Sequence, residues 1–153
     1  MQIVDFLPQQ AAAFRALNEA WLARHLRVTP LDEAVLADPV GAIIAAGGRI
    51  FMAMDGDDAV GCAALLPLPD AGFEVGRMAV TENYRGVGVG RALLQTCIET
   101  ATALGAKRLY LEASSVLTPA LSLYRSMGFR PLTRGRPGAP QDDRIDIWME
   151  RPL

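Results

Sequence analysis

The chain has 153 residues, of which 51% are hydrophobic, so it can bury a full core and we expect a single domain over residues 1–153. Its 15 basic and 17 acidic residues give a net charge of −2, which argues against a general nucleic-acid binder, because such proteins carry a basic stripe. The single histidine and the two cysteines, Cys62 and Cys97, lack metal-ligand spacing, so we expect no metal.

The N-terminal segment and the apolar stretches of the chain indicate where in the cell the protein is found. The N-terminus lacks the basic start and long apolar run of a signal peptide. No apolar stretch approaches the roughly 20 residues of a membrane span. Each cysteine lies within an apolar run, as small buried hydrophobic residues do. We therefore expect a cytoplasmic protein with no membrane partner.

The first half of the chain predicts two helices and a hairpin. Proline at position 8 suits the first turn of a helix, and Phe14, Leu17 and Trp21 form its apolar stripe. The dipeptide Asp55-Gly56 between two apolar runs is a strong hairpin signal. The expected elements are a strand over 3–6, helices over 8–25 and 29–38, a short apolar turn over 42–46, and strands over 49–54 and 59–66.

The next strand, which begins after Gly72, contains a change of parity. Positions 73 and 75 share one face under strict alternation, whereas positions 78 and 80 share the other. One extra residue at Gly76-Arg77, a β-bulge, would restore a single apolar face and leave backbone N–H groups unpaired. Such groups stabilise a carbonyl oxygen as negative charge develops on it. The alternative is a strand buried on both faces, where parity carries no information.

A glycine-rich loop follows this strand and leads into an amphipathic helix. Gly86, Gly88 and Gly90 alternate with valines and let the backbone approach a ligand closely. The free N–H groups and positive dipole end of the helix favour phosphate, and the flanking Arg85 and Arg91 would add charge-assisted contacts. We expect this loop to bind a pyrophosphate. The alternative is a flexible turn.

The second half of the chain alternates helices and strands. The helix after the glycine loop ends at Gly105, and the strand that follows implies a parallel pair joined by a right-handed crossover. Thr118 is expected to cap the next helix, with Pro119 in its first turn. The expected elements are helices over 91–104 and 118–127 and strands over 108–113, 129–132 and 144–150.

Three phosphate-binding motifs compete for the glycine loop. The nucleotide-hydrolase loop requires a lysine after its last glycine, and none is present. The dinucleotide motif GxGxxG would place a third glycine at Arg91, although Glu112 supplies an acidic residue about 20 positions downstream. The loop resembles the coenzyme A loop of the GCN5-related N-acetyltransferase (GNAT) family, [QR]-x-x-G-x-[GA], at Arg85, Gly88 and Gly90.

A second segment resembles the same family. The run ALSLYRSMGF over 120–129 is similar to its signature A-x-x-L-Y-x-x-x-G-F, with matches at Leu123, Tyr124, Gly128 and Phe129. The two motifs and the order of the segments cover nearly the whole chain. The resemblance implies an α/β (α+β) fold with a mixed, mostly antiparallel sheet of six or seven strands, flanking helices and a splayed parallel pair at its centre.

The resemblance also implies acetyl-CoA as co-substrate and assigns contacts to it. The acetyl-pantetheine arm would lie in the gap of the splayed pair, beside a strand backbone, and the loop backbone would cradle the pyrophosphate. At Leu117 many relatives carry asparagine, so a backbone group of Leu117 or Thr118 would replace that contact. The implied cofactor-binding residues are Met78, Ala79, Val80, Arg85, Gly86, Val87, Gly88, Val89, Gly90, Arg91, Leu117 and Thr118.

By the same resemblance, Tyr124 would be the general acid that returns a proton to the departing thiolate. A phenol with a pKa near ~10 is protonated at neutral pH and poorly nucleophilic, which suits this role. The alternative is a core tyrosine in an apolar stripe. Glu74 is the first candidate for the general base and Glu112 the second, with a solvated or ion-paired carboxylate as the alternative for both.

The acceptor is expected to be a small molecule with a primary amine, or an amino-acid-like molecule. In this family the first two helices and the final hairpin wall the acceptor pocket, which places Trp21, Arg24, Asp32 and Glu33 near it. Arg24 would bind a carboxylate, and Asp32 and Glu33 an amine; the alternative is ordinary surface charge. The expected assembly is a monomer or homodimer. A non-catalytic coenzyme A sensor is the alternative function, and a dinucleotide oxidoreductase is the third.

Overall fold

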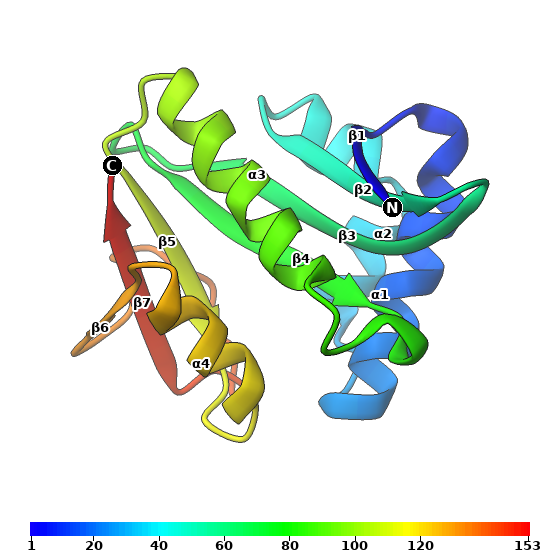
Figure 1. The fold of residues 1–153 in the computed structure, drawn as a ribbon. Helices are drawn as coiled ribbons and strands as arrows, with labels where there is room; N and C mark the ends of the chain where they lie inside the picture. The colour runs from blue at the N-terminus through cyan, green and yellow to red at the C-terminus, as the bar shows by residue number, and fades with distance from the viewer.

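The computed structural model describes residues 1–153 and contains one seven-stranded sheet with helices on both faces (Figure 1). The strand order is β1-β2-β3-β4-β5-β7-β6, and β4 and β5 are the one parallel pair. The predicted mixed, mostly antiparallel sheet is therefore confirmed. The strands are β1 (Gln2–Asp5), β2 (Arg49–Asp55), β3 (Asp58–Pro67), β4 (Phe73–Val80), β5 (Arg108–Ala113), β6 (Arg130–Leu132) and β7 (Ile147–Pro152).

Helix α2 begins where the sequence supplies both a cap and a proline. At the start of α2, the Thr29 hydroxyl accepts a hydrogen bond from the Asp32 amide at 3.2 Å, and the Asp32 carboxylate accepts one from the Thr29 amide at 3.0 Å. None of the helices combines the length and the apolar character needed to cross a membrane. The helical segments are η1 (Pro8–Gln10), α1 (Ala11–His25), α2 (Pro30–Ala37), η2 (Val40–Ile44), η3 (Glu82–Tyr84), α3 (Val89–Ala103) and α4 (Thr118–Ser126).

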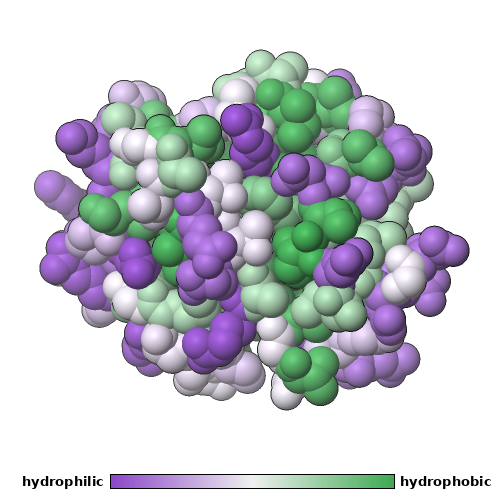
Figure 2. Space-filling model, turned by 45° about the horizontal axis from the view of Figure 1, so that its top comes forward, coloured by the Kyte–Doolittle hydropathy of each residue, from purple (hydrophilic) through white to green (hydrophobic).

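Two apolar cores lie on opposite faces of the sheet. Helices α3 and α4 cover one face, where Leu93, Leu94 and Leu121 belong to one buried cluster. Helices α1 and α2 cover the other face, where Phe14 and Leu36 belong to the second cluster. On the face shown in Figure 2, apolar residues form several small patches separated by hydrophilic side chains. The two buried clusters lie between the sheet and its helices.

Strand β4 contains the predicted bulge. Cys62 of β3 pairs with Ala79, and Ala64 pairs with Gly76, so β4 has one residue more than β3 over this stretch. Arg77 adopts a φ of +52°, unusual for a residue with a side chain. Positions 73, 75, 78 and 80 consequently all pack against the cluster under α3, and Ala79 packs on the other face. The bulge therefore restores one apolar face, as the parity change predicted.

The parallel pair is short, and the sheet opens beyond it. β4 and β5 pair only at Phe73 with Leu109 and at Glu74 with Tyr110. Farther along, β5 pairs with β7 alone, while β4 remains paired with β3. The expected splayed pair is therefore present at the centre of the sheet.

Several element boundaries differ by a few residues from the sequence-based expectations, and two of these differences concern the site. β7 begins at Ile147, whereas a strand from Arg144 was predicted, because Asp142 turns the chain there. Its carboxylate accepts hydrogen bonds from the Arg144 amide at 3.0 Å and from the Arg144 guanidinium at 2.6 Å. The cap of α4 is Leu117, one residue before the predicted Thr118, and Pro119 is the second helical residue.

Candidate active site

A cavity of about 840 Å³ lies where β4 and β5 separate. Its walls come from α1, α2, the two strands, the start of α4 and the loop between β6 and β7. Glu74 and Tyr124, the two predicted catalytic residues, both line it, and so do Glu112, Met78 and Leu117. The fold thus brings Tyr124 of the second sequence motif together with carboxylates of β4 and β5, whereas none of residues 85–91 lines this cavity.

The cavity connects the two faces of the sheet. Residues 109, 111 and 113 of β5 pack under α3, so by strand alternation Tyr110 and Glu112 point to the opposite face. Glu74 lies between Phe73 and Val75, which also pack under α3, and therefore shares the face of Glu112. Tyr124 comes from α4 on the α3 side. A group held in the opening can therefore meet carboxylates from one face and a phenol from the other.

Glu74 has the properties of a proton acceptor that titrates near neutral pH. Burial and the nearby charge of Glu112 raise the pKa of Glu74 to about 7, against the opposing effects of Arg136 and Arg77. Its Oε1 lies 3.7 Å from Nε of Arg136, which is an ion-pair distance but too long for a hydrogen bond. Near pH 7 a large fraction of Glu74 is therefore ionised and able to take a proton.

Glu112, the second candidate base, is held by a hydrogen bond. The Tyr110 hydroxyl donates to Oε2 of Glu112 at 2.8 Å and accepts from the Arg136 amide at 3.1 Å. Burial, together with the Glu112 carboxylate, raises the pKa of Tyr110 to about 12. Tyr110 therefore stays protonated and fixes both the carboxylate and the loop that carries Arg136.

Tyr124 lies in a less polar environment. Burial alone raises the pKa of Tyr124 to about 12, and no group of the chain hydrogen-bonds to its hydroxyl. Its ring packs against Phe129 with centroids 6.1 Å apart. The hydroxyl is thus protonated at neutral pH and has its proton available to a group in the cavity.

The glycine loop presents free backbone donors. Gly86 and Gly88 have φ of +76° and +93°, which only glycine adopts readily. No amide of residues 86–91 donates a hydrogen bond of ordinary geometry to the backbone of the chain, and α3 begins within this run. Gly90 faces α4, since a Cβ there would lie 3.5 Å from the Leu123 side chain. Six consecutive donors at a helix start beside α4 form a site suited to phosphate oxygens.

The arginines that flank this loop already have partners in the chain. Nη1 of Arg85 lies 3.2 Å from Nε2 of His25 and 3.5 Å from the Glu82 carboxylate. Nη2 of Arg91 donates to the Ser126 hydroxyl at 2.9 Å, which joins α3 to α4. Phosphate contacts from these two side chains would require them to rotate, whereas the backbone amides need no such change.

The opened edge of β4 offers further backbone groups. The Thr81 amide donates a hydrogen bond to the Val60 carbonyl of β3. Backbone groups along a strand point alternately to its two neighbours, so those of Ala79 also face β3. The N–H and C=O groups of Met78 and Val80 therefore face away from β3. Of the three residues predicted to pair with the pantetheine arm, only Met78 and Val80 therefore present backbone groups to the opening. At the start of α4, Leu117 lines the cavity and the Thr118 amide has no backbone partner.

A buried ion cluster closes one side of the cavity. Asp32 receives Nη1 of Arg77 at 2.6 Å and Nη1 of Arg144 at 2.7 Å, and Arg144 also pairs with Asp142 at 2.6 Å. Burial alone would raise the pKa of Asp32, but the hydrogen bonds from both arginines lower it to about 2. This carboxylate is therefore committed to two arginines, and its predicted role as an amine-binding group is wrong.

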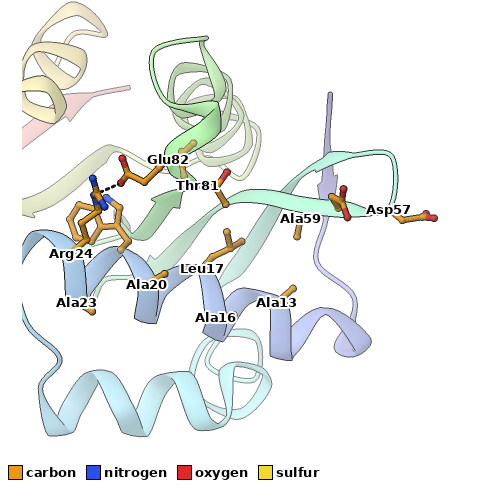
Figure 3. A pocket seen from close by; sticks show the side chains of 13 residues that line it. Ala13, Ala16, Leu17, Ala20, Ala23, Arg24, Asp57, Ala59, Thr81 and Glu82 are labelled. Carbon is orange, nitrogen blue, oxygen red and sulfur yellow. Dashed lines mark ion pairs between the residues drawn. The ribbon is translucent and has the colours of Figure 1, made fainter.

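Arg24, expected in the acceptor pocket, lies in a different cavity. This second cavity, of about 790 Å³, lies between α1 and the hairpin of β2 and β3 (Figure 3). Alanines of α1 line it, and Arg24 pairs with Glu82 at 3.0 Å at one end. Glu33 is exposed and lines neither cavity, whereas Trp21 lines both. Of the four residues expected near the acceptor, Trp21 and Asp32 reach the cavity of Glu74.

Three residues of the site did not emerge from the sequence: Tyr110, Arg136 and Arg144. Tyr110 and Glu112 are two residues apart in a strand, so the sequence could have indicated that their side chains lie on the same face. The loop of residues 133–146 has no periodicity, and nothing in it distinguishes Arg136 from its neighbour Arg134. No group of three or more His, Cys, Asp or Glu side chains is arranged to hold a metal ion.

Comparisons with known sequences agree with this geometry. The model of the acetyltransferase (GNAT) family matches residues 11–129. An "IAA acetyltransferase" from Azospirillum brasilense is 35% identical over 106 residues, which cover 69% of this chain and 68% of that protein. "N-acetyltransferase family 8 member 2" from Rattus norvegicus is 30% identical over 72% of this chain, and the match spans about half of the rat protein, 51%.

Solved structures share the whole fold. An acetyltransferase of the GNAT family from Staphylococcus aureus Mu50 superposes with a TM-score of 0.90 at 20% identity, covering 99% of this chain and 98% of that one. A GNAT superfamily phosphinothricin acetyltransferase from Sinorhizobium meliloti, solved in complex with AcCoA, superposes with a TM-score of 0.81 at 20% identity over 99% of this chain and 88% of that one. At these identities the likeness establishes the fold.

Proposed function

The chain belongs to the GNAT family of acetyltransferases, and from this premise we propose that it moves an acetyl group from acetyl-CoA to the primary amine of a small-molecule acceptor by direct attack. The proposed catalytic unit is the single domain of residues 1–153. The observation that carries the proposal is the cavity at the opening of the sheet, which both Glu74 and Tyr124 line. When bound, acetyl-CoA supplies a thioester whose carbonyl carbon forms the new C–N bond and whose C–S bond breaks.

The residues present suit this co-substrate. The free amides of residues 86–91 would hold the pyrophosphate, because they are orphaned donors at a helix N-terminus. The backbone groups of Met78 and Val80 that face the opening, and those at Leu117 and Thr118, would hold the pantetheine arm.

Proton transfer is assigned to residues on the two sides of the cavity. Glu74, with a pKa of about 7, accepts the proton that the acceptor ammonium must lose before its nitrogen can attack. Tyr124, kept protonated by burial, donates its phenolic proton to the departing sulfur. As the C–S bond breaks, the nitrogen gives up its second proton, which returns through solvent to the Tyr124 phenolate. Glu74 passes its own proton to solvent, so the protein is regenerated and one proton is released per turnover.

A panel of primary amines tests the proposal. Purified protein, acetyl-CoA and each amine are mixed, the released thiol is measured, and the acetylated product is identified by mass spectrometry. Acetylation of at least one small amine, with one thiol released per product, is expected. Binding of acetyl-CoA in calorimetry without product from any amine would instead establish the non-catalytic sensor.

A further inference from the structure

Arg136 is a cation of the cavity whose hydrogen-bonding capacity is unused. It lies in the loop between β6 and β7, and its Nε atom is buried without a hydrogen-bond partner. The nearest acidic group, Oε1 of Glu74, is 3.7 Å from Nε. A buried donor left without an acceptor destabilises the protein. An acceptor that enters the cavity with Arg136 would remove this penalty.

The loop holds Arg136 in a fixed position. The Arg136 amide donates to the Tyr110 hydroxyl at 3.1 Å, and that hydroxyl donates to Glu112. The preceding residue, Gly135, is pressed against β7, since a Cβ there would lie 2.8 Å from Nε1 of Trp148. A side chain so anchored at its backbone is pre-organised for a ligand and loses little entropy on binding.

The other arginines that line the cavity are already neutralised. Arg77 is paired with Asp32, and Arg144 is paired with both Asp32 and Asp142. Displacing either would leave the buried Asp32 without its partner, which is strongly unfavourable. Arg136 is therefore the cationic side chain of this cavity that a ligand anion can engage without breaking a tight ion pair.

The short separation between Arg136 and Glu74 restricts the acceptor. If Glu74 takes the proton of the acceptor amine, a group bound by Arg136 must lie next to that amine. An amine and a carboxylate attached to the same carbon satisfy this condition, because the two groups are neighbours. A long chain between them would have to fold back on itself. A guanidinium also matches the two oxygens of a carboxylate in shape.

Apolar residues form much of the wall that α1, α2 and the end of β3 give to the cavity, where the Asp32 carboxylate is already paired with Arg77 and Arg144. Trp21, Leu26, Leu31, Val35 and Leu66 belong to this wall. They would remove an apolar side chain from water, whereas they offer no partner to a charged one. Arg136 and Glu74, together with these apolar side chains, thus match the charged groups and the side chain of an apolar amino acid.

We propose that the acceptor is an α-amino acid with an apolar side chain, and that Arg136 binds its carboxylate. This inference rests on the proposed acetyltransferase function and names the substrate class of the same site. Arg136 is then a specificity-determining residue that also places the amine beside Glu74.

Matched sets of acceptors test the inference with the full-length protein and acetyl-CoA. Leucine, leucinamide and 3-methylbutylamine share one side chain, as do phenylalanine, phenylalaninamide and phenethylamine. We expect kcat/KM for each free amino acid to exceed that of its amide and amine by about 10- to 100-fold, because the charge-assisted contact is lost. Equal values across a set would overturn the inference and leave the acetyltransferase function intact, whereas no product from any amine would remove both.

Variants of two arginines complete the test. Arg136→Gln should bring the ratio of amino acid to amide close to one, and Arg136→Lys, which keeps the charge without the planar fork, should give an intermediate ratio. The ratio is the right readout because Arg136 also lowers the pKa of Glu74, so its removal affects all acceptors. Arg134→Gln, an exposed neighbour outside the cavity, should leave the ratio unchanged. A full preference in Arg136→Gln would contradict the proposal.

Discussion

Glu74 of β4 and Tyr110 of β5 form the last pair of the two parallel strands, and the sheet opens directly after them. The bulge at Arg77 lies three residues farther along β4 and bends this strand, while β5 continues in register with β7. Because of this opening, a carboxylate on one face and the Tyr124 phenol on the other line a single cavity. The strand irregularity therefore accompanies the opening at which the proposed proton transfer from two sides would take place.

Replacing Tyr124 with phenylalanine should impair the chemical step. The variant loses the hydroxyl that protonates the leaving sulfur, and a general acid typically contributes 10²–10⁴-fold. We expect kcat to fall by about 10²-fold. The affinity for acetyl-CoA, measured by calorimetry, should stay close to that of the parent, because the hydroxyl makes no hydrogen bond in the chain. Unchanged turnover in a folded variant would show that Tyr124 is a core residue.

The pH dependence of the rate should identify the base. Glu74 acts when deprotonated, so kcat/KM should rise with pH through about 7, the pKa of its carboxyl group, and then level off. Glu74→Gln should lack this limb. Glu112→Gln should keep the limb but shift it to lower pH, because the Glu112 charge raises the pKa of Glu74. A limb near pH 7 that survives in Glu74→Gln would assign the base elsewhere.

Local sequence signals predicted most of the fold. Periodicity, caps and glycines placed nearly every helix and strand, and β5 was predicted with the bounds observed, Arg108–Ala113. The parity change at Gly76-Arg77 predicted the bulge, since side-chain alternation has a fixed period. The family motifs led to Tyr124, for which the apolar stripe of its helix alone left a core role and a functional role equally open.

The partners of Asp32 and Glu74 could not be predicted in this way. Asp32 meets Arg144 across a separation of 112 residues, and Glu74 meets Arg136 from an irregular loop. Such contacts depend on how a loop without periodicity folds over the sheet, which no local rule determines. Tertiary contacts can also override a local pattern. The alternation of residues 144–150 predicts a strand from Arg144, but Arg144 bonds to Asp32 and Asp142, and the strand begins only at Ile147.

Two glycines offer a matched test of the phosphate loop. Gly88 and Gly105 have positive φ angles of +93° and +79°, and a Cβ at either would meet no atom within 4 Å. Alanine at each position should therefore lower the free energy of unfolding by a similar amount, about 1–2 kcal/mol. Gly88→Ala should also weaken acetyl-CoA binding by about 10-fold or more, because the loop amides lose their alignment. Gly105→Ala, at the far end of α3, should bind acetyl-CoA normally.

Calorimetric titration with acetyl-CoA and thermal unfolding of both variants give the comparison. Equal losses of affinity in the two variants would mean that the effect is one of general stability. Unchanged affinity in Gly88→Ala would show that the co-substrate is held without the alignment of this loop.

The ion cluster around Asp32 should dominate stability on the α2 side of the cavity. Asp32→Asn leaves Arg77 and Arg144 without their shared carboxylate, and breaking a buried pair destabilises proteins by about 3–5 kcal/mol. Asp143→Asn is the matched control, because Asp143 pairs with Arg27 at the surface with 78% of its side chain exposed. That change should alter the free energy of unfolding by about 1 kcal/mol or less. Chemical denaturation of the two variants measures the difference.

Acid should remove the same contribution from the parent protein. The pKa of Asp32 is lowered from 3.8 to about 2, so its stabilisation is fully present above pH 3.8 and is lost as the pH falls toward 2. The difference in unfolding free energy between the parent and Asp32→Asn should therefore be constant from pH 5 to 7 and shrink below about pH 4. A difference that stays constant down to pH 2 would mean that Asp32 does not owe its role to the ionised form, and that the cap it provides to α2 is the larger effect.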